Sequence, residues 1–209
     1  MSFIRTNDNL PRPQIFASHA GSEILCPVVK RPILGVGRGG QMLEMPGFSG
    51  TYASRDGQPV PLGVVSDSYE VVQMRDLCAG AERVMQDAFT PDQLASVEIR
   101  DTSAGGGSWV KRQYVVKAFE EALEYGNATA RTIDVGTTVA ATCSITTSYD
   151  GGSSTQLDIG TLDLVCQNGM TALSSMDWFR KRHTKTATVE VFEDWLTDLA
   201  PRFAAQVET

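Results

Sequence analysis

The chain has 209 residues, of which 42% are hydrophobic and 8% aromatic, and it carries a net charge of −7. This length and apolar content suit one globular domain with a single core. Because the sequence has no run of 18 apolar residues and no hydrophobic secretory signal, we expect a cytoplasmic protein without a membrane partner.

The charge is unevenly distributed along the chain. Residues 41–108 hold ten acids against four cations, and residues 187–209 hold five acids against one. Residues 1–40 carry five cations against two acids, whereas residues 109–186 balance at eight of each. An anionic whole argues against general adhesion to nucleic acid, but this distribution leaves room for a local basic surface.

The cysteines and histidines give no sign of a metal or catalytic site. No two cysteines form a C-x-x-C pair, and His19 and His183 are the only imidazoles. We therefore expect buried, reduced thiols, no zinc, no cofactor and no histidine-based catalysis, so the chain is predicted not to be an enzyme. The four cysteines are Cys26, Cys78, Cys143 and Cys166.

Residues 1–60 are rich in proline and glycine, which disfavour regular elements. We predict a loop-rich N-terminal arm over residues 1–60 that wraps the domain or a neighbouring subunit, followed by a core domain over residues 61–209. The glycines at 35, 37 and 40 match G-x-G-x-x-G, but Pro46 leaves no room for the helix that a dinucleotide site requires. The prolines of this segment are Pro11, Pro13, Pro27, Pro32, Pro46 and Pro59.

Beyond residue 61 the pattern becomes regular. A strand near residues 62–65 precedes an amphipathic helix from Met74 to Ala88, and a strand pair covers residues 95–101 and 108–116. The spacing of Val116, Phe119, Ala122 and Leu123 predicts a helix that ends before Gly126.

The next segment predicts a hairpin. Residues 139–148 alternate between a more apolar face and a hydroxyl-rich face, and the second face should meet solvent or a ligand. Asp150 and Gly151 provide the turn, a returning strand leads to Cys166, and a helix is expected after Asn168. A final amphipathic helix starts near Val189 and is kinked or shortened by Pro201. The fold class is therefore α+β, with an antiparallel hairpin sheet packed against amphipathic helices.

A basic cluster near the end of the chain is the main candidate site. It places four cations within six residues, directly after Trp178 and Phe179. Single-stranded nucleic acid is held by such combinations, because cations follow the phosphates while aromatic faces stack on bases. A solvated helix end with both aromatic residues in the core fits the pattern equally well. The cations are Arg180, Lys181, Arg182 and Lys185.

A second, weaker set lies on the predicted strand at residues 108–116. Alternation places Trp109 and Lys111 on one face and Arg112 and Tyr114 on the other, so only one pair can face a ligand.

Four short motifs carry a family resemblance, and they occur in the order VVSDSYEVV (64–72), SYDG (148–151), VCQN (165–168) and RHT (182–184). Together they resemble the phage/plasmid-like family of unknown function, found in prophages, phages and conjugative plasmids. The resemblance covers residues 62–199 and implies a mobile-element setting without an established active site. The order of strands, hairpin and helix is also similar to single-strand annealing proteins of the Red-beta, RecT and Rad-type group, which implies a homo-oligomer in the form of a ring or filament.

Two hypotheses follow for the function. The first is a single-stranded DNA-binding and annealing protein that acts in recombination or replication. The second is an acidic interaction protein that binds or inhibits a host protein without nucleic acid. For the first, the expected contacts are Arg180, Lys181, Arg182, Lys185, Lys111 and Arg112 on phosphates, with Trp109 or Tyr149 stacking on bases.

Overall fold

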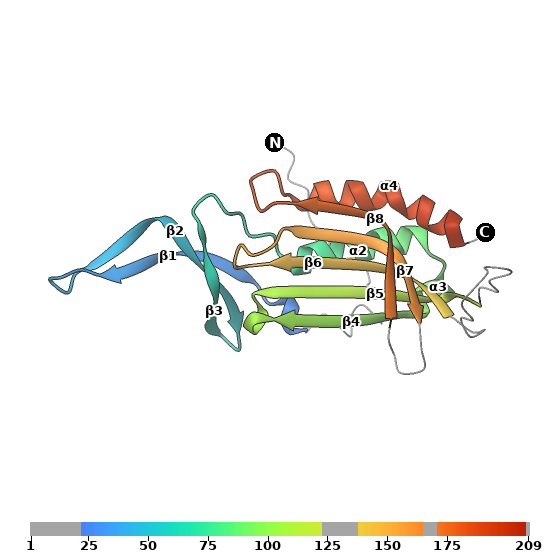
Figure 1. The fold of residues 1–209 in the computed structure, drawn as a ribbon, viewed down its shortest axis with the longest axis horizontal. Helices are drawn as coiled ribbons and strands as arrows, with labels where there is room; N and C mark the ends of the chain where they lie inside the picture. The colour runs from blue at the N-terminus through green and yellow to red at the C-terminus, as the bar shows by residue number, and fades with distance from the viewer. Residues whose placement is uncertain (1–21, 123–137, 165–170, 208–209) are drawn as a thin grey trace, which may run out of the picture.

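A computed structural model describes residues 22–122, 138–164 and 171–207, and it shows two antiparallel sheets with a layer of helices (Figure 1). The first sheet has the order β1-β2-β3 and the second β4-β5-β6-β7-β8, so the predicted α+β class with antiparallel strands is confirmed. The strands are β1 (Val28–Val36), β2 (Met42–Arg55), β3 (Gln58–Ser66), β4 (Val97–Ala104), β5 (Trp109–Ala122), β6 (Thr138–Ser148), β7 (Thr155–Leu164) and β8 (Thr171–Lys181). The helices are η1 (Glu23–Leu25), α2 (Met74–Ala88), α3 (Pro91–Ala95), η2 (Gly105–Gly107) and α4 (Val189–Val207).

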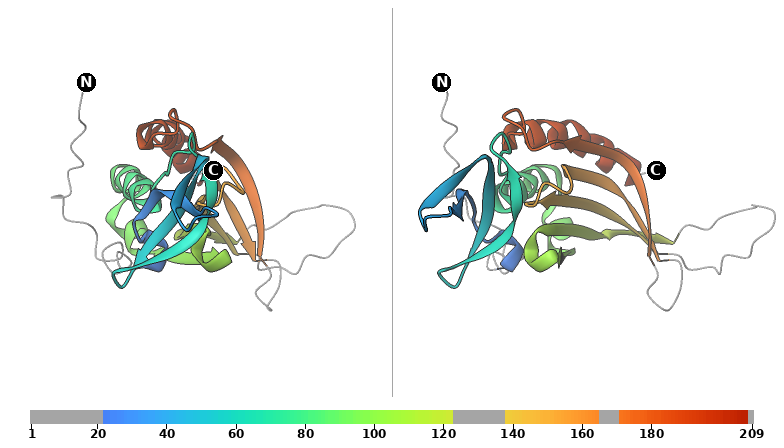
Figure 2. Two further views of the ribbon diagram at one scale, coloured as in Figure 1. Left: turned by 90° about the vertical axis from the view of Figure 1, so that its left-hand side faces the viewer. Right: turned by 60° about the vertical axis from the view of Figure 1, so that its left-hand side comes forward.

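The helices cover one face of the five-stranded sheet. Figure 2 shows α2 and α4 together on the same side of the curved sheet, with the other side free of helices. Along β5, the buried residues Val110, Tyr114 and Val116 face the helices and join the core, in which they meet Leu77 of α2 and Phe192 of α4. The core therefore lies between the sheet and the two long helices.

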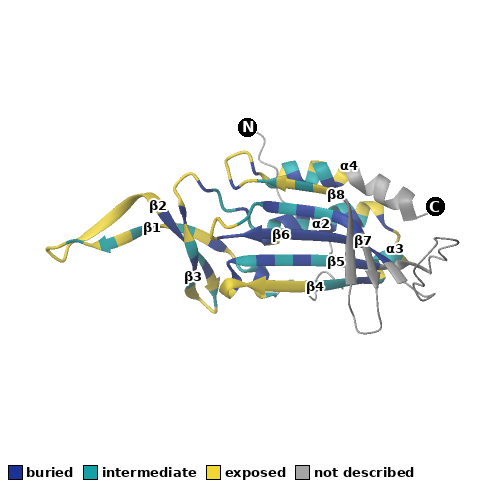
Figure 3. Cartoon of the chain, in the orientation of Figure 1, coloured by how far each residue is buried: buried dark blue, intermediate teal, exposed yellow. Residues whose placement is uncertain are grey.

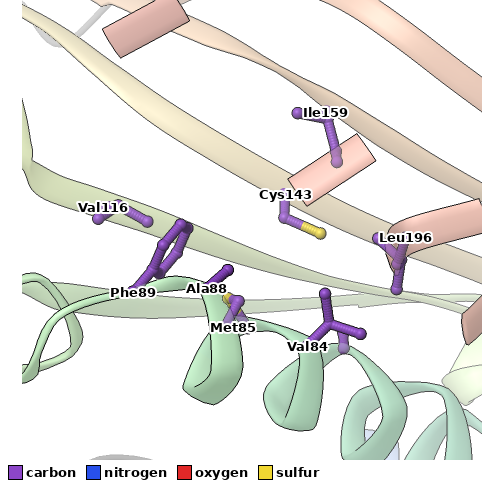
Figure 4. Close-up of a pocket in the computed structure, with 9 residues that line it drawn as sticks. Val84, Met85, Ala88, Phe89, Val116, Cys143, Ile159 and Leu196 are labelled. Atoms are coloured by element: carbon purple, nitrogen blue, oxygen red, sulfur yellow. The ribbon is translucent and has the colours of Figure 1, made fainter. Parts of the chain in front are cut away.

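The helix α2 forms where the sequence predicts it. Its apolar side chains recur every three or four residues, and those on the inward side are buried against the sheet. A small apolar cavity of about 30 Å³ remains under its C-terminal end (Figure 4). No polar side chain lines this cavity, which therefore offers no chemistry. The lining residues are Ala81, Val84, Met85, Ala88, Phe89, Val116, Cys143, Ile159 and Leu196.

The prediction of an irregular arm over residues 1–60 is wrong for residues 28–60, because these residues form most of the three-stranded sheet. The sheet tolerates its prolines because they lie on edge strands or in a bulge, where a missing N–H breaks no ladder hydrogen bond. Pro32 and Pro59 lie on the outer strands β1 and β3, and Pro46 lies in a bulge where residues 45–48 of β2 oppose only Ile33 of β1. Residues 1–21 lie outside the described part of the chain.

Two predicted helices are replaced by strands. Residues 119–122 continue β5, and Glu121 and Ala122 pair with Val139 and Thr138 of β6. The region after Asn168 re-enters the sheet as β8, which pairs with β7 along its whole length. In both segments the apolar spacing is typical of a helix, but pairing with a neighbouring strand determines the structure. The sequence of a single segment does not reveal that strand. Residues 123–125 and 165–170 are outside the described residues.

The C-terminal helix α4 is longer than predicted, since it runs through Pro201 to Val207. It is held against α2 by an ion pair between Arg83 and Glu193. Within the described segments, none of the helices combines the length and the apolar character that crossing a membrane would require.

Candidate nucleic-acid interface

The helix-free face of the five-stranded sheet, which we call the open face, collects part of the predicted site. Trp109 and Lys111 point to this face, whereas Arg112 and Tyr114 point into the core, so the predicted division of the strand is confirmed. On β6 the hydroxyl-rich side also belongs to the open face, through residues such as Thr142 and Ser144. Thr142, Ser144 and Ser148 are each only 1% exposed, so the prediction that this side meets solvent or a ligand is wrong at these positions. Thr146 is partly exposed, and the other accessible groups of the open face lie on the flanking strands.

Strand register aligns the two predicted sets across the sheet. Lys111 of β5 is level with Thr146 of β6, which is level with Gln156 of β7 and then with Arg180 of β8. Three strand spacings separate the backbones of Lys111 and Arg180 by roughly 14 Å. The two cations therefore flank a strip of neutral polar side chains.

Trp178 is the aromatic residue of the basic cluster that reaches the open face, which the sequence alone does not distinguish from Phe179. It lies two residues before Arg180 on the same face of β8, and its relative exposure is 61%. Its neighbour Phe179 points to the helices, with its ring centroid 5.4 Å from that of Phe192 in an edge-to-face arrangement. The alternation of a strand, rather than the expected helix, is the signal that separates these two aromatic residues.

The rest of the basic cluster spreads around the end of β8. Lys181 alternates to the other face and is half-buried, whereas Arg182 and Lys185 are exposed in the loop that leads to α4. Among the described residues, no carboxylate lies within ion-pair distance of Lys111, Arg180 or these three cations. The cluster is thus divided between one face and a loop, with its charges available.

The open face also carries acids. Arg100 of β4 pairs with Glu98 on the same face at 2.7 Å, and Asp158 of β7 accepts a hydrogen bond of 2.7 Å from Gln156. These acids reduce the net positive charge of the face.

Arg112 does not belong to the predicted interface, because its side chain is only 1% exposed and lies in the core. Its Nε and Nη2 donate to the two carboxylate oxygens of Asp101 at 2.8 Å each, and Nη1 lies 3.6 Å from Glu82 Oε1. Burial alone would lower the pKa of the guanidinium, but the hydrogen bonds with Asp101 and the charge interactions with neighbouring acidic groups together outweigh burial and raise the pKa. Arg112 is a structural cation that neutralises two carboxylates.

Tyr149 cannot stack on a base as predicted, since it is 1% exposed. Its hydroxyl accepts a hydrogen bond from the backbone N–H of Met74 at 3.1 Å, and its carbonyl accepts one from the Thr51 hydroxyl at 2.5 Å. Burial raises the pKa of its phenol. Tyr149 therefore links the start of α2 to the three-stranded sheet.

Three of the four sequence motifs meet at the junction of the two sheets. Tyr69, from the first motif, donates a hydrogen bond to the carbonyl of Ser148 in the second, at 2.5 Å. His183, from the fourth, has its Nδ1 3.1 Å from the Glu70 carbonyl. Burial lowers the pKa of His183, and the hydrogen bond to Glu70 opposes this shift. The remaining motif, residues 165–168, is outside the described residues.

Further hydrogen bonds fix the segment that carries Tyr69. The Asp67 carboxylate accepts hydrogen bonds from the Ser49 hydroxyl at 2.6 Å and from the Gly47 N–H at 3.0 Å. Lys30 donates to the carbonyls of Asp67 and Tyr69 at 2.8 Å each. These contacts therefore hold the segment after β3 against the three-stranded sheet.

Comparison with known proteins identifies a family but no activity. No curated protein and no solved structure matches the chain. A family model described as "Domain of unknown function (DUF932)" matches residues 61–208, which begin inside β3 and include the whole five-stranded sheet. The chain therefore belongs to the DUF932 family.

Proposed function

We propose that this protein binds single-stranded nucleic acid on the open face of its five-stranded sheet. The observation that carries the proposal is the shared face of Trp178, Arg180, Lys111 and Trp109. An exposed indole offers a stacking surface for a base, and the two cations offer contacts for phosphates on either side of the polar strip. Arg182 and Lys185 extend the cationic surface beyond the end of β8.

The distribution of acids supports this choice of face. The exposed acids Glu190, Asp194 and Asp198 lie on α4, in the helix layer on the other side of the sheet. Much of the negative charge is therefore separated from the open face by the thickness of the sheet, and screening in salt weakens its effect there further.

The biological role rests on the resemblance stated above. A phage/plasmid-like protein of this kind would hold single strands for annealing during recombination or replication, in the cytoplasm of the cell that carries the mobile element. It would act as a homo-oligomer, without a catalytic step or a cofactor. Lys111, Arg180, Arg182 and Lys185 would contact phosphates, and Trp178 with Trp109 would stack.

The test is fluorescence anisotropy with a labelled oligothymidine and with a duplex of equal length. Replacing Trp178 with alanine should weaken single-strand binding by about 1–3 kcal/mol, the value of one stacked base. Trp178→Phe keeps an aromatic face and should recover most of the affinity. Binding that is unchanged by Trp178→Ala, or absent from the wild type, would refute the proposal.

A matched charge control is available on the helix side. Arg75 of α2 has a side chain that is 57% exposed, and it lies on the opposite layer from the open face. Arg75→Ala removes the same charge as Arg180→Ala, so only the second should reduce affinity strongly. Equal losses would indicate a general electrostatic effect.

The second candidate is an interaction protein that uses its acids to bind a basic partner without nucleic acid. The exposed acids of α4 favour it, since an acidic helix face attracts cationic proteins and repels DNA. The variant Asp194→Asn/Asp198→Asn distinguishes the two candidates. It should leave or slightly improve nucleic-acid binding under the first, and it should abolish partner binding under the second.

A further inference from the structure

Exposed apolar side chains are concentrated on the three-stranded sheet. Of the nine large hydrophobic residues that are exposed among those described, only Trp178 lies elsewhere. We call the other eight the hairpin patch; Figure 3 colours the start of β2 as exposed, while the end of β1 alternates between exposed and intermediate. The hairpin patch consists of Val29, Leu34, Val36, Met42, Leu43, Met45, Phe48 and Val64.

The hairpin patch is open on both sides of its strands. Val36 pairs with Met42, and residues that pair across strands share a face. Leu43 pairs with Gly35 at the neighbouring position, so its side chain points to the opposite face. Figure 1 shows this end of the hairpin extending beyond the rest of the molecule, with no helix on either side. Among the described residues, no other element covers this end of the hairpin.

The size of the hairpin patch matches a protein interface. Eight side chains that are roughly half exposed present several hundred Å² of apolar surface in total, divided between the two faces of the hairpin. A standard interface uses about 800 Å² on each partner. Two hairpins that pack so that both faces of each are covered would supply a substantial part of that area.

We propose that the occupant is a second copy of this chain, which contributes its own hairpin patch about a two-fold axis. The described surface has no second apolar area on which a neighbouring copy's hairpin would rest, since Trp178 is the only large hydrophobic residue exposed elsewhere among the described residues. A head-to-tail contact, which a ring or filament uses, needs two different complementary surfaces. The isologous pair needs only one, and the hairpin patch is that surface.

Charge does not oppose this pairing. The hairpin carries the exposed cations Arg31 and Arg38 together with the exposed acid Glu44. Each copy thus brings both signs to the contact, so the two hairpins do not meet as surfaces of a single like charge.

The test is the mass and dissociation constant of the full chain, by sedimentation equilibrium without nucleic acid. The wild type should have twice the monomer mass of 22.6 kDa. Val36→Asp, at a site 74% exposed, should weaken the dimer at least about tenfold without unfolding the chain, because each charge enters the two-fold contact twice. Leu43→Asp should do the same from the other face.

The matched control is Ser103→Asp, which places the same charge at an exposed strand position of β4 outside the hairpin patch. It should leave the dimer intact. A monomeric wild type, a closed ring of higher mass, or equal dissociation constants for the control and both patch variants would overturn the proposal.

Crosslinking gives a second measurement that does not depend on the aspartate variants. Val36→Cys with a bismaleimide should yield a covalent dimer, and Ser103→Cys should not. Crosslinking at neither position, or equally at both, would overturn the two-fold contact even if an aspartate variant failed to fold. Both measurements omit nucleic acid, so their outcome is independent of the proposed binding function.

Discussion

The imidazole of His183 stacks on the phenol ring of Tyr69, with ring centroids 4.5 Å apart and planes inclined by 17°. The two residues are far apart in sequence, and the stack joins the segment after β3 to the loop after β8. The same loop carries Arg182 and Lys185, so the stack fixes the base of a cationic loop. A motif histidine thus has a positioning role near the proposed interface.

The folded protein should lose stability as the pH falls below 6.5. Burial lowers the pKa of His183 from its ordinary value of 6.5, so the unfolded chain takes up a proton at a higher pH than the folded chain does. The contribution of neutral His183 is therefore complete above pH 6.5 and declines as the pH falls towards the lowered pKa. Urea unfolding at a series of pH values from 8 to 5 measures this dependence.

The variant His183→Gln isolates the histidine from the carboxylates that titrate at lower pH. It should be less stable than the wild type at pH 8, because it loses the stack on Tyr69. The difference between the two proteins should shrink as the pH falls. A constant difference over the whole range would show that His183 is not the titrating group.

Gly63→Ala should destabilise the junction of the two sheets. A Cβ at Gly63 would lie 2.6 Å from the Cα of Asp150, so the backbone of β3 or of the Asp150 turn has to move. Overpacking of this kind costs about 1–3 kcal/mol of unfolding free energy. The control Gly35→Ala places its Cβ 3.9 Å from the nearest atom, the Leu43 carbonyl oxygen, and should be nearly neutral. Equal effects in thermal unfolding would contradict this account.

Replacing Arg112 should destabilise the folded protein strongly, whereas replacing Arg180 should hardly change its stability. Arg112→Ala leaves the carboxylates of Glu82 and Asp101 without their cation in the core, which costs about 3–5 kcal/mol of stability. Arg180→Ala removes an exposed side chain and should change stability by less than about 0.5 kcal/mol. Chemical unfolding compares the two variants directly. A neutral Arg112→Ala would remove the structural role assigned to this residue.

Alternation along strands was the most reliable guide from sequence to site. The sequence predicts that Lys111 and Arg112 face opposite ways, and the structure places Lys111 on the open face and Arg112 in the core. The sequence did not indicate which face is covered, because that depends on where α2 and α4 pack. The ion partners of Arg112, Asp101 on the paired strand and Glu82 on a helix, also required the tertiary structure.

The missed strands have a common cause. The helical spacing of Phe119 and Ala122 is a local signal, and pairing with β6 after a bulge overrides it. A helix over this segment would group Trp178 with Phe179, whereas the alternation of β8 places them on opposite faces. Pro46 also led to a wrong prediction, because in the sequence a proline in a strand bulge cannot be told apart from a proline in a loop.

The most direct test of the central claim is the salt dependence of oligothymidine binding by the wild type and by Lys111→Ala/Arg180→Ala. If Lys111, Arg180, Arg182 and Lys185 contact four phosphates, the logarithm of affinity should fall with the logarithm of salt concentration at a slope of about −3. Removing two contacts should reduce the magnitude of that slope by about 1.4. A slope near zero, or equal slopes for the two proteins, would contradict nucleic-acid binding on the open face.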